Sequence, residues 1–317
     1  MTRCLLLLAA VACGAANAQP YPARAIRIIV PFTGGGGVDI VTRTLAQKMS
    51  ESMGQSIVID NRAGAGGNIG IEAAVRAAPD GYTLLMASSA MTINPSIYKT
   101  LRYDPVADLM PISQASVIPL VLVTNPTVPA RSLRELAALA ANPKTKLTYA
   151  TAGVGNSTHL AMELLKIMTK THMLHVPYKS TAQKNMDVIS GQIDMMFAAP
   201  PSVTAHIRAG QMRALAVSGA KRSSVLPELP TVAEAGVAGY EFASWNGLFA
   251  PAGTANEIIV KLNQEMQKAL GNADVKARLA GDGADPAGNS PAEFAAYVKS
   301  EIGKYAKLVA ATAIPKE

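Results

Sequence analysis

Cysteine is scarce in this sequence of 317 residues, which contains only Cys4 and Cys13. Both lie within the first eighteen residues, which we predict to be a secretory signal peptide that is removed. The mature chain would then begin at Gln19 and contain no cysteine. This prediction excludes a structural disulfide and a catalytic or metal-binding thiolate.

The predicted signal peptide, residues 1–18, has the expected three parts. Arg3 supplies a positive charge, residues 5–12 form an apolar run too short to span a membrane, and a small-residue Ala-Asn-Ala sequence precedes the predicted cleavage after Ala18. We therefore predict export to the periplasm. Acylation of Cys13 in a lipoprotein is the alternative. It is disfavoured because alanine, and not the usual leucine, stands three residues before that cysteine.

Charged residues are also few, at 16% of the chain. The net charge is +7, or +6 once Arg3 is removed, because 28 basic residues then face 22 acidic ones. No basic block is longer than Lys221-Arg222, so we expect no nucleic-acid partner, and only solubility or a weak attraction of anionic ligands. With 49% hydrophobic residues, the chain is typical of a well-buried α/β protein, and its length predicts two lobes.

The residue patterns of known catalytic and cofactor sites are absent. No Walker loop or Gly-x-Ser-x-Gly elbow occurs, and each glycine-containing loop lacks the last glycine of a dinucleotide-binding sequence. Ser157 and His159 are too close in sequence to act as nucleophile and base. His172 and His175 would point to opposite faces of a strand, so they cannot bind one metal ion. We therefore predict no catalytic residue, no metal site and no cofactor, and we do not expect an enzyme.

The most informative stretch begins with Ile26–Val30, a β-branched run typical of a buried strand. The four glycines 34–37 then leave the backbone bare, and an apolar stripe from Val38 indicates a helix. A strand, a glycine turn and a helix start place free backbone N–H groups against an anion. Asp39 is interpreted as a residue of the first helical turn that complements the helix dipole, and its charge would repel a phosphate. A glycine hinge that only turns the chain is the alternative.

Further along, strands alternate with helices, which predicts parallel sheets covered by helices. We expect strands at 26–30, 56–60, 82–86, 146–150, 172–176, 193–197 and 212–218, and helices at 38–49, 71–77, 131–141, 160–168, 182–190, 202–209, 257–270, 275–280 and 291–311. Crossovers between the lobes are expected at 112–124 and 226–251. The loops that leave the carboxyl ends of the first strands should converge: 32–38, 62–70 and the polar turn 87–94.

The same design returns in the second half of the chain. A strand ending at Ala150 leads into the loop Thr151–Ser157, and a helix follows with Ser157 or Thr158 as its expected cap, which leaves the amides of 153–157 facing outward. Two helix starts, one in each lobe, would then face each other across a cleft. A carboxylate between them could accept several charge-assisted hydrogen bonds of roughly 1.5–3 kcal/mol each. Lobe closure would exclude water, so the sequence predicts binding without chemistry.

These segments resemble, in the same order, the sequences of Bug-type periplasmic solute-binding proteins that serve tripartite tricarboxylate transporters. The resemblance covers nearly the whole mature chain. It is carried by Val30-Pro31-Phe32 with the glycines and Asp39, and by the segments 61–70 (Asn-Arg-Ala-Gly-Ala-Gly-Gly-Asn-Ile-Gly), 78–84 (Ala-Pro-Asp-Gly-Tyr-Thr-Leu), 152–155 (Ala-Gly-Val-Gly) with His159-Leu160, 175–179 (His-Val-Pro-Tyr-Lys), 191–194 (Gly-Gln-Ile-Asp), 213–217 (Arg-Ala-Leu-Ala-Val), 229–234 (Leu-Pro-Thr-Val-Ala-Glu) and 250–254 (Ala-Pro-Ala-Gly-Thr).

The resemblance implies an α/β, type II periplasmic-binding-protein fold with two doubly wound lobes, a ligand cleft and two crossovers. Lobe 1 would comprise residues 19–120 and 246–317, and lobe 2 residues 121–245. It also implies that one ligand carboxylate is held, partly through water, between two loops. The residues implied are Phe32, Thr33, Gly34, Gly35 and Gly36, with Asp39, in the first loop, and Thr151, Ala152, Gly153, Gly155, Asn156 and Ser157 in the second. The other end of the ligand would meet Ser88, Ser89, Asn94, Tyr178, Lys179 and Ala198.

Two positions depart from the pattern of this family. Ala198 stands where many members have an acidic or amide residue, and Asn246 follows Trp245 where a hydrophobic or aromatic residue is frequent. The change at Ala198 would remove a partner for an amino or hydroxyl group on the ligand. This favours a plain or aromatic carboxylate.

We therefore predict a monomeric solute-binding protein that captures a small organic acid by lobe closure. The acid would be a di- or tricarboxylate or an aromatic carboxylate, delivered to the subunits of a membrane transporter. The alternative is a carboxylate sensor that presents its ligand-bound form to a signalling partner. Both functions need the same cleft, so the sequence leaves both open.

Overall fold

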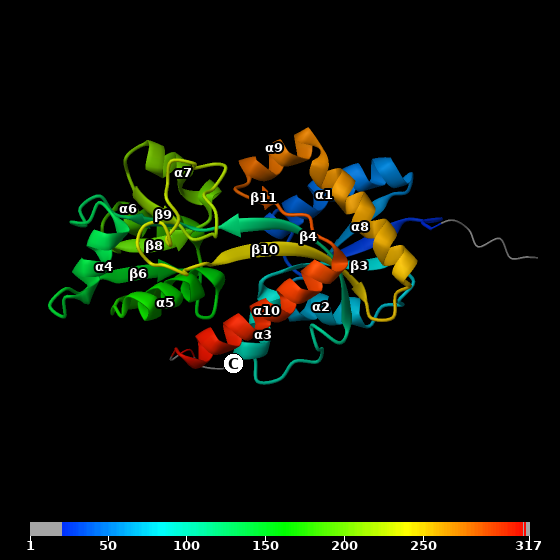
Figure 1. The fold of residues 1–317 in the computed structure, drawn as a ribbon, viewed down its shortest axis with the longest axis horizontal. Coiled ribbons are helices and arrows are strands. Elements are labelled where there is room, and N and C mark those ends of the chain that lie inside the picture. Colours follow the sequence, from blue (N-terminus) through cyan, green and yellow to red (C-terminus); the bar gives the residue numbers. More distant parts are fainter. Residues whose placement is uncertain (1–20, 313, 315–317) are drawn as a thin grey trace, which may run out of the picture.

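The computed structural model describes residues 21–312 and 314, so the predicted signal peptide and Cys13 lie outside the described residues. The strands form two separate sheets (Figure 1). The first sheet has the spatial order β11 (Asp285–Pro286), β4 (Leu109–Pro119), β10 (Ala243–Pro251), β3 (Thr83–Ser88), β1 (Ile26–Val30) and β2 (Ile57–Asn61). The second has the order β7 (Leu174–Pro177), β6 (Thr148–Thr151), β8 (Met195–Ala198), β5 (Val121–Thr124) and β9 (Arg213–Val217).

Helices cover both sheets, as alternating strands and helices predict. Those that follow first-sheet strands are α1 (Gly37–Met53), the short η1 (Ala65–Gly67), α2 (Asn68–Val75), α3 (Ala90–Ile97), α8 (Asn256–Gly271), α9 (Ala273–Gly281) and α10 (Pro291–Ala310). Those of the second lobe are α4 (Leu133–Ala141), α5 (Ser157–Thr169), α6 (Thr181–Ile189) and α7 (Pro200–Arg208). Within the described part of the chain, no helix combines the length and the apolar character needed to cross a membrane.

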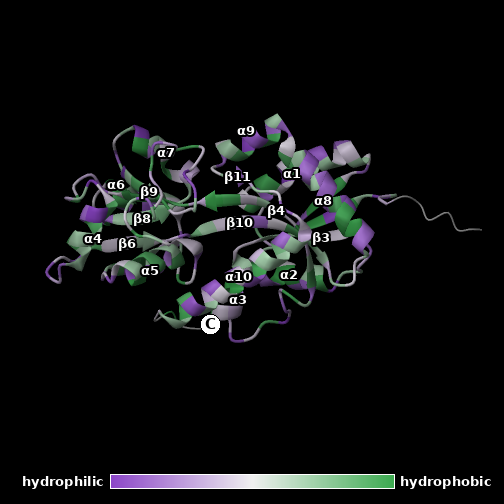
Figure 2. Cartoon of the chain, viewed as in Figure 1, coloured by the Kyte–Doolittle hydropathy of each residue, from purple (hydrophilic) through white to green (hydrophobic). Residues whose placement is uncertain are grey.

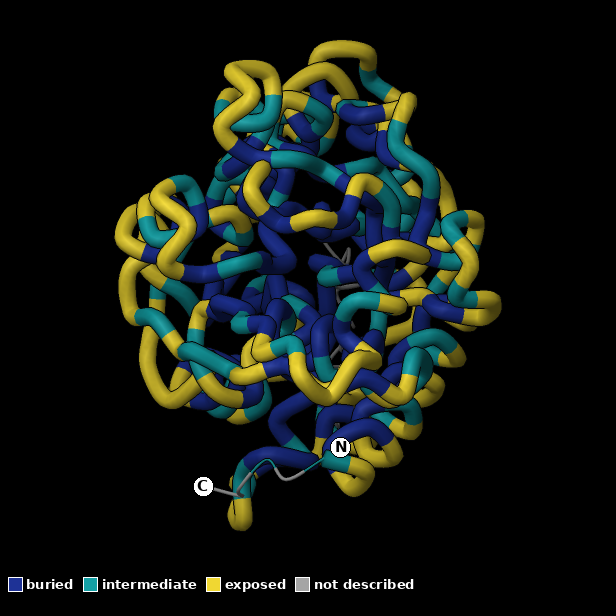
Figure 3. The backbone as a smooth tube through the Cα atoms, turned by 90° about the vertical axis from the view of Figure 1, so that its left-hand side faces the viewer, coloured by how far each residue is buried: buried dark blue, intermediate teal, exposed yellow. Residues whose placement is uncertain are grey.

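Strand direction places the loops of interest together. β1 pairs in parallel with β2 and β3, and β6 pairs in parallel with β7 and β8. The carboxyl ends of these strands therefore lie along one edge of each sheet, where loops line a crevice. Apolar residues fill the sheets and the helix faces against them (Figure 2). Figure 3 shows the buried residues in the interior of the molecule and the exposed residues mostly in its outer segments.

The chain crosses between the sheets where the sequence predicts. β4 belongs to the first sheet and β5 to the second, with Leu120 alone between them. The return crossover ends in β10, which pairs antiparallel with β4 from Ala243 opposite Pro119 to Pro251 opposite Leu109. The two crossovers are confirmed. The limits of the lobes at residues 120/121 and 245/246 remain a prediction.

Two further contacts tie the lobes together. α10 packs Phe294 and Val298 against the core of the first lobe, whereas Tyr305 and Leu308 join the core of the second. Gly283, just after α9, lies against the start of α7, since a Cβ built on it would be 2.7 Å from Pro201 Cδ. In Figure 1, α10 lies below the β4–β10 pair and the contact between α7 and α9 above it.

Two segments differ from the sequence-based expectation. Residues 87–94, expected as a polar turn, instead complete β3 and begin α3, which contains Pro95 in its interior. The small residues Ala87–Ala90 suggested a turn, and the proline argued against a helix. The strand β11 was not predicted, because two residues are too short for a hydrophobic pattern.

Gly247 in β10 provides a test of the packing that joins β10 to α10. A Cβ at this position would lie 2.2 Å from Phe294 Cζ, so Gly247→Ala should lower the free energy of unfolding by roughly 1–3 kcal/mol. In the matched control, Gly303→Ala, the Cβ meets nothing within 4 Å in a helix interior, so that variant should be about 0.5–1 kcal/mol more stable. Chemical denaturation measures both. Equal stabilities for the two variants would contradict this packing.

Candidate functional site

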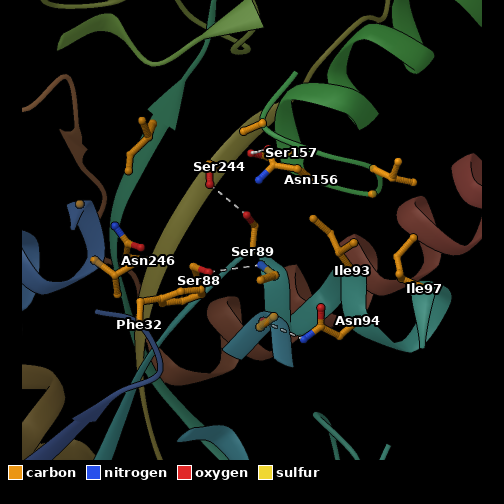
Figure 4. A pocket seen from close by; sticks show the side chains of 18 of the residues that line it. Phe32, Ser88, Ser89, Ile93, Asn94, Ile97, Asn156, Ser157, Ser244 and Asn246 are labelled. Atoms are coloured by element: carbon orange, nitrogen blue, oxygen red, sulfur yellow. Dashed lines mark hydrogen bonds between the residues drawn. The ribbon is translucent and has the colours of Figure 1, made fainter. Parts of the chain in front are cut away.

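A cavity of about 410 Å³ lies between the carboxyl edge of the first sheet and the start of α5 in the second lobe (Figure 4). Its lining comes from both lobes: Phe32, Gly37, Val38, Gly66, Ser88, Ser89, Ala90, Ile93, Asn94, Ile97, Tyr98, Ile118, Ala152, Val154, Gly155, Asn156, Ser157, Ser244 and Asn246. Among these described residues there is no aspartate, glutamate, lysine, arginine or histidine. The lining itself can therefore contact an anion only through backbone, hydroxyl and amide dipoles.

Three helices begin at the cavity: α1, α3 and α5. The N-terminus of a helix carries a partial positive charge, and its first N–H groups have no acceptor within the helix. The sequence predicted two of these helix starts. The third, α3, replaces the expected polar turn.

The start of α1 is open to the cavity. Its N-cap is Gly36, which has no side chain to accept a hydrogen bond. The amides of Gly37 and Val38 both belong to cavity residues, and neither has an acceptor among the described residues. A bound anion could therefore accept from them.

Asp39 holds the loop before α1 from beneath. Its side chain is 3% exposed and accepts from the Gly35 amide at 2.8 Å, from Asn61 Nδ2 at 2.9 Å and from Arg43 Nε at 2.8 Å. The Arg43 hydrogen bond is the largest cause that lowers the pKa of Asp39 to about 2. This carboxylate faces donors within the protein and does not line the cavity. These bonds fit its interpretation as a residue of the first helical turn.

The first two amides at the start of α3 are bonded within the protein. The Ser89 amide donates to Trp245 O at 3.0 Å, and the Ala90 amide donates to Ser88 Oγ at 3.3 Å. Ser89 Oγ and Ser244 Oγ lie 3.0 Å apart. Hydroxyl groups, and not free amides, are what this helix start presents to the cavity.

The start of α5 differs from the sequence-based expectation. Its cap is Asn156, whose Oδ1 accepts from the Thr158 amide at 2.9 Å, and not Ser157 or Thr158. The expectation that all amides of 153–157 face outward was also wrong. Those of Gly153, Gly155 and Asn156 donate to Thr151 Oγ1, His159 Nδ1 and Gly153 O, respectively. In the described structure only Val154 and Ser157 in that range have amides without an acceptor.

Two stacked histidines hold the second loop at both ends. His159 Nδ1 accepts from the Gly155 amide at 3.1 Å, and Thr151 Oγ1 lies 2.6 Å from His175 Nε2. The two rings are 3.9 Å apart and 10° from parallel. Because Nδ1 accepts, His159 carries its proton on Nε2. His159 therefore orders this loop from the first turn of α5.

Burial keeps His159 neutral. Its side chain lies behind the loop, against His175 and Tyr149, with Glu163 and Lys166 on its own helix. Burial first, and His175 second, lower the pKa of His159 to about 4. Burial also lowers the pKa of His175.

The structure brings some of the predicted site residues together. Those that line the cavity are Phe32, Ser88, Ser89, Asn94, Ala152, Gly155, Asn156 and Ser157. Asn94 is tied by its Nδ2 to Gly66 O and Asn68 Oδ1.

The other predicted residues lie beside or behind the cavity lining. Thr33, Gly34 and Gly35 are exposed, Gly36 and Gly153 are half-buried, and Asp39 and Thr151 are buried. Tyr178 donates its hydroxyl to Asp187 Oδ2 at 2.6 Å, Lys179 is exposed, and Ala198 is buried opposite Val121.

Sequence reasoning missed part of the lining. Ile93 and Ile97 stand four residues apart on one face of α3, so assigning a helix there would have found them. Gly37 and Val38 could have been named from the sequence, because they stand at the start of the predicted helix α1. Ser244 could not be found from the sequence, because it reaches the cavity only through the pairing of β10 with β3.

Comparisons with known proteins agree on one family. The family model described as "Tripartite tricarboxylate transporter family receptor" matches residues 41–314. A "UPF0065 protein in tcbD-tcbE intergenic region" from a Pseudomonas species is 39% identical over 290 residues, which cover 91% of this chain and 86% of that protein. Protein BugT of Bordetella pertussis is 37% identical over 298 residues, which cover 93% of this chain and 91% of BugT.

Solved structures give the same result. Rpa4515 of R. palustris, whose structure is described as "with adipate", is 36% identical with a TM-score of 0.77, over 92% of this chain and 98% of that one. MatC of Rhodopseudomonas palustris, described "with bound malate", is 31% identical with a TM-score of 0.74, over 91% of this chain and 100% of that one.

The neutral state of His159 predicts a pH dependence of stability. The folded protein binds the His159 proton more weakly than the unfolded chain, so stability is full above about pH 6.5 and falls as the pH drops toward 4. We expect a fall in Tm of several degrees between pH 7 and pH 4.5. His159→Asn retains an oxygen near the position of Nδ1 but does not titrate, so its Tm should fall less. Differential scanning calorimetry of both proteins checks this, and parallel curves would refute the role of His159.

Proposed function

The chain belongs to the receptor family of the tripartite tricarboxylate transporters, and from this membership we propose that it captures a small organic acid between its lobes for a membrane transporter. The comparisons confirm the family that the sequence predicted and its two-lobed fold. Members of this family are binding proteins and not enzymes, as was also predicted. A solved relative, 37% identical with a TM-score of 0.78, is described as a periplasmic transporter. We extend the periplasmic location to this chain.

One observation carries the proposal: an uncharged cavity that both lobes line with residues whose backbone amides have no acceptor among the described residues. The amides of Gly37 and Val38 come from the first lobe, and those of Val154 and Ser157 from the second. A carboxylate needs several N–H donors and an electropositive environment, which helix starts supply without a charged side chain. Closing the lobes on such an anion would bring donors from both lobes to its oxygen atoms.

Two relatives support a carboxylate ligand. The structures of Rpa4515 and MatC are described with adipate and malate, respectively, and both of those ligands are dicarboxylates. For this chain we propose an organic acid among the di- and tricarboxylates and the aromatic carboxylates. The protein would bind it as a monomer and present it to the transporter subunits.

A thermal-shift panel tests the ligand class. The mature protein, Gln19 to Glu317, is unfolded and refolded to remove any retained ligand, and is then heated with mono-, di- and tricarboxylates and aromatic acids. An acid present at one hundred times its Kd should add about 2.7 kcal/mol of stability, which raises Tm by several degrees. If amines or sugars raise Tm and no acid does, the carboxylate proposal fails.

Ser157→Asp separates binding from folding. Ser157 is the first residue of α5, and a carboxylate there complements the helix dipole, so the ligand-free variant should be as stable as the wild type or slightly more stable. The same charge faces the bound anion, so acid binding should weaken by at least about a hundredfold. Ser157→Asn matches the side-chain size without the charge and should bind nearly as well as the wild type. Isothermal titration measures all three, and unchanged affinity in Ser157→Asp would place the anion elsewhere.

A further inference from the structure

Asn94, in α3, presents a hydrogen-bond acceptor of fixed orientation to the cavity. The residue is 4% exposed, and its Nδ2 donates to Gly66 O at 3.2 Å and to Asn68 Oδ1 at 2.7 Å. A backbone carbonyl oxygen can only accept, so the amide atom that faces Gly66 has to be the nitrogen. The side-chain amide therefore cannot turn over, and its oxygen points away from these two partners (Figure 4).

The side-chain oxygen of Asn94 is accessible and has no donor. None of the described residues donates a hydrogen bond to it. It is also not one of the enclosed polar side-chain atoms that lack a partner in the described structure, so solvent reaches it. Asn94 lines the cavity and is otherwise covered, so that access is through the cavity. A ligand that displaces water from this oxygen has to supply a donor of its own.

The helix face around this oxygen is apolar. Ala90, Ile93, Asn94 and Ile97 follow one another at helical spacing on α3, and all four line the cavity. Asn94 is the one polar side chain among them. An acceptor in such surroundings has no neighbouring group that could replace a lost hydrogen bond, so leaving it dry costs free energy.

A neutral donor suits this oxygen better than a charged group does. A carboxylate can only accept, so it cannot pair with an amide oxygen that is unable to turn away. An ammonium group could donate, but the described lining has no carboxylate to compensate its charge. A hydroxyl group can donate to the oxygen without either difficulty. A second carboxylate elsewhere on the same ligand remains compatible with this arrangement.

We infer that the ligand is a hydroxy acid and that its hydroxyl group donates to Asn94 Oδ1. The inference rests on the proposed function, which supplies the carboxylate, and adds to it the substituent of the acid and the residue that recognises it. The sequence-based preference for a plain acid rested on Ala198, which is buried and lies outside the cavity lining.

Matched acids test for this donor. The mature protein, freed of retained ligand, is titrated calorimetrically with succinate, glutarate and benzoate and with their hydroxy and fluoro derivatives, the substituent being placed at each carbon in turn. Fluorine is close to a hydroxyl group in size but cannot donate a hydrogen bond. For the acid and the position that fit the cavity best, the hydroxy derivative should bind about tenfold more tightly than the plain and the fluoro acid.

Two variants assign the preference to Asn94. Asn94→Leu removes the acceptor and keeps a side chain of similar size, so it should bind the plain and the hydroxy acid about equally. Tyr103→Phe is the matched control, because it removes another hydrogen bond of the same buried group, from the Tyr103 hydroxyl to Asn68 Oδ1 at 2.8 Å, and leaves the Asn94 oxygen in place. That variant should show the same preference as the wild type.

The outcomes are distinct. If the plain or fluoro acids bind as tightly as the hydroxy acids at every position, or if Asn94→Leu keeps the preference, the inference is wrong and the proposed function stands. If no acid of any form binds, the proposed function fails, and the inference fails with it. A hydroxyl preference that Asn94→Leu loses and Tyr103→Phe keeps supports both. The comparison of hydroxy and fluoro acids needs only the wild-type protein, so it decides even if Asn94→Leu does not fold.

Discussion

The N–H groups at the start of a helix need acceptors from outside the helix, and the way each start meets this need decides where the protein can bind. At α3 Ser88 and at α5 Asn156 supply a side-chain oxygen. At α1 the chain supplies glycine, and the first amides of the helix remain open. Under the proposed function, the binding capacity of the cavity comes from helix starts that the protein leaves incompletely capped, and the bound anion would complete them.

Each open loop is fixed from behind by a different ionisable group. In the first lobe the Asp39 carboxylate, charged and paired with Arg43, accepts from the loop amide of Gly35. In the second, the neutral imidazole of His159 accepts from the amide of Gly155. These two ionisable side chains therefore lie behind the cavity lining. The lining itself presents backbone, hydroxyl, amide and apolar groups. Under the proposed function, such a site would hold a carboxylate without a salt bridge, and the remainder of the wall would select among acids.

Much of the fold could be predicted from hydrophobic period and glycine placement. The strand Ile26–Val30 has the predicted bounds, and the helix start after the glycines lies within one residue of its predicted position. The loop before α1 could be predicted as an open helix start, because a glycine at the N-cap has no side chain that could accept from the first amides. The α3 segment could not, because Ser88-Ser89-Ala90 suits a turn as well as a helix start and Pro95 favours neither. Asn246 lines the cavity only because β10 pairs with β3, and such long-range pairing leaves no local pattern in a sequence.

The ties between the lobes also limit how the protein can move. α10 packs against both cores on one side of the β4–β10 pair, and Gly283 meets the start of α7 on the other. A motion of one lobe against the other that kept both of these contacts would have to turn about the line that joins them. Occupancy of the cavity would then change one angle of the whole molecule. A membrane partner could sense that angle from the outer surface alone, without touching the ligand.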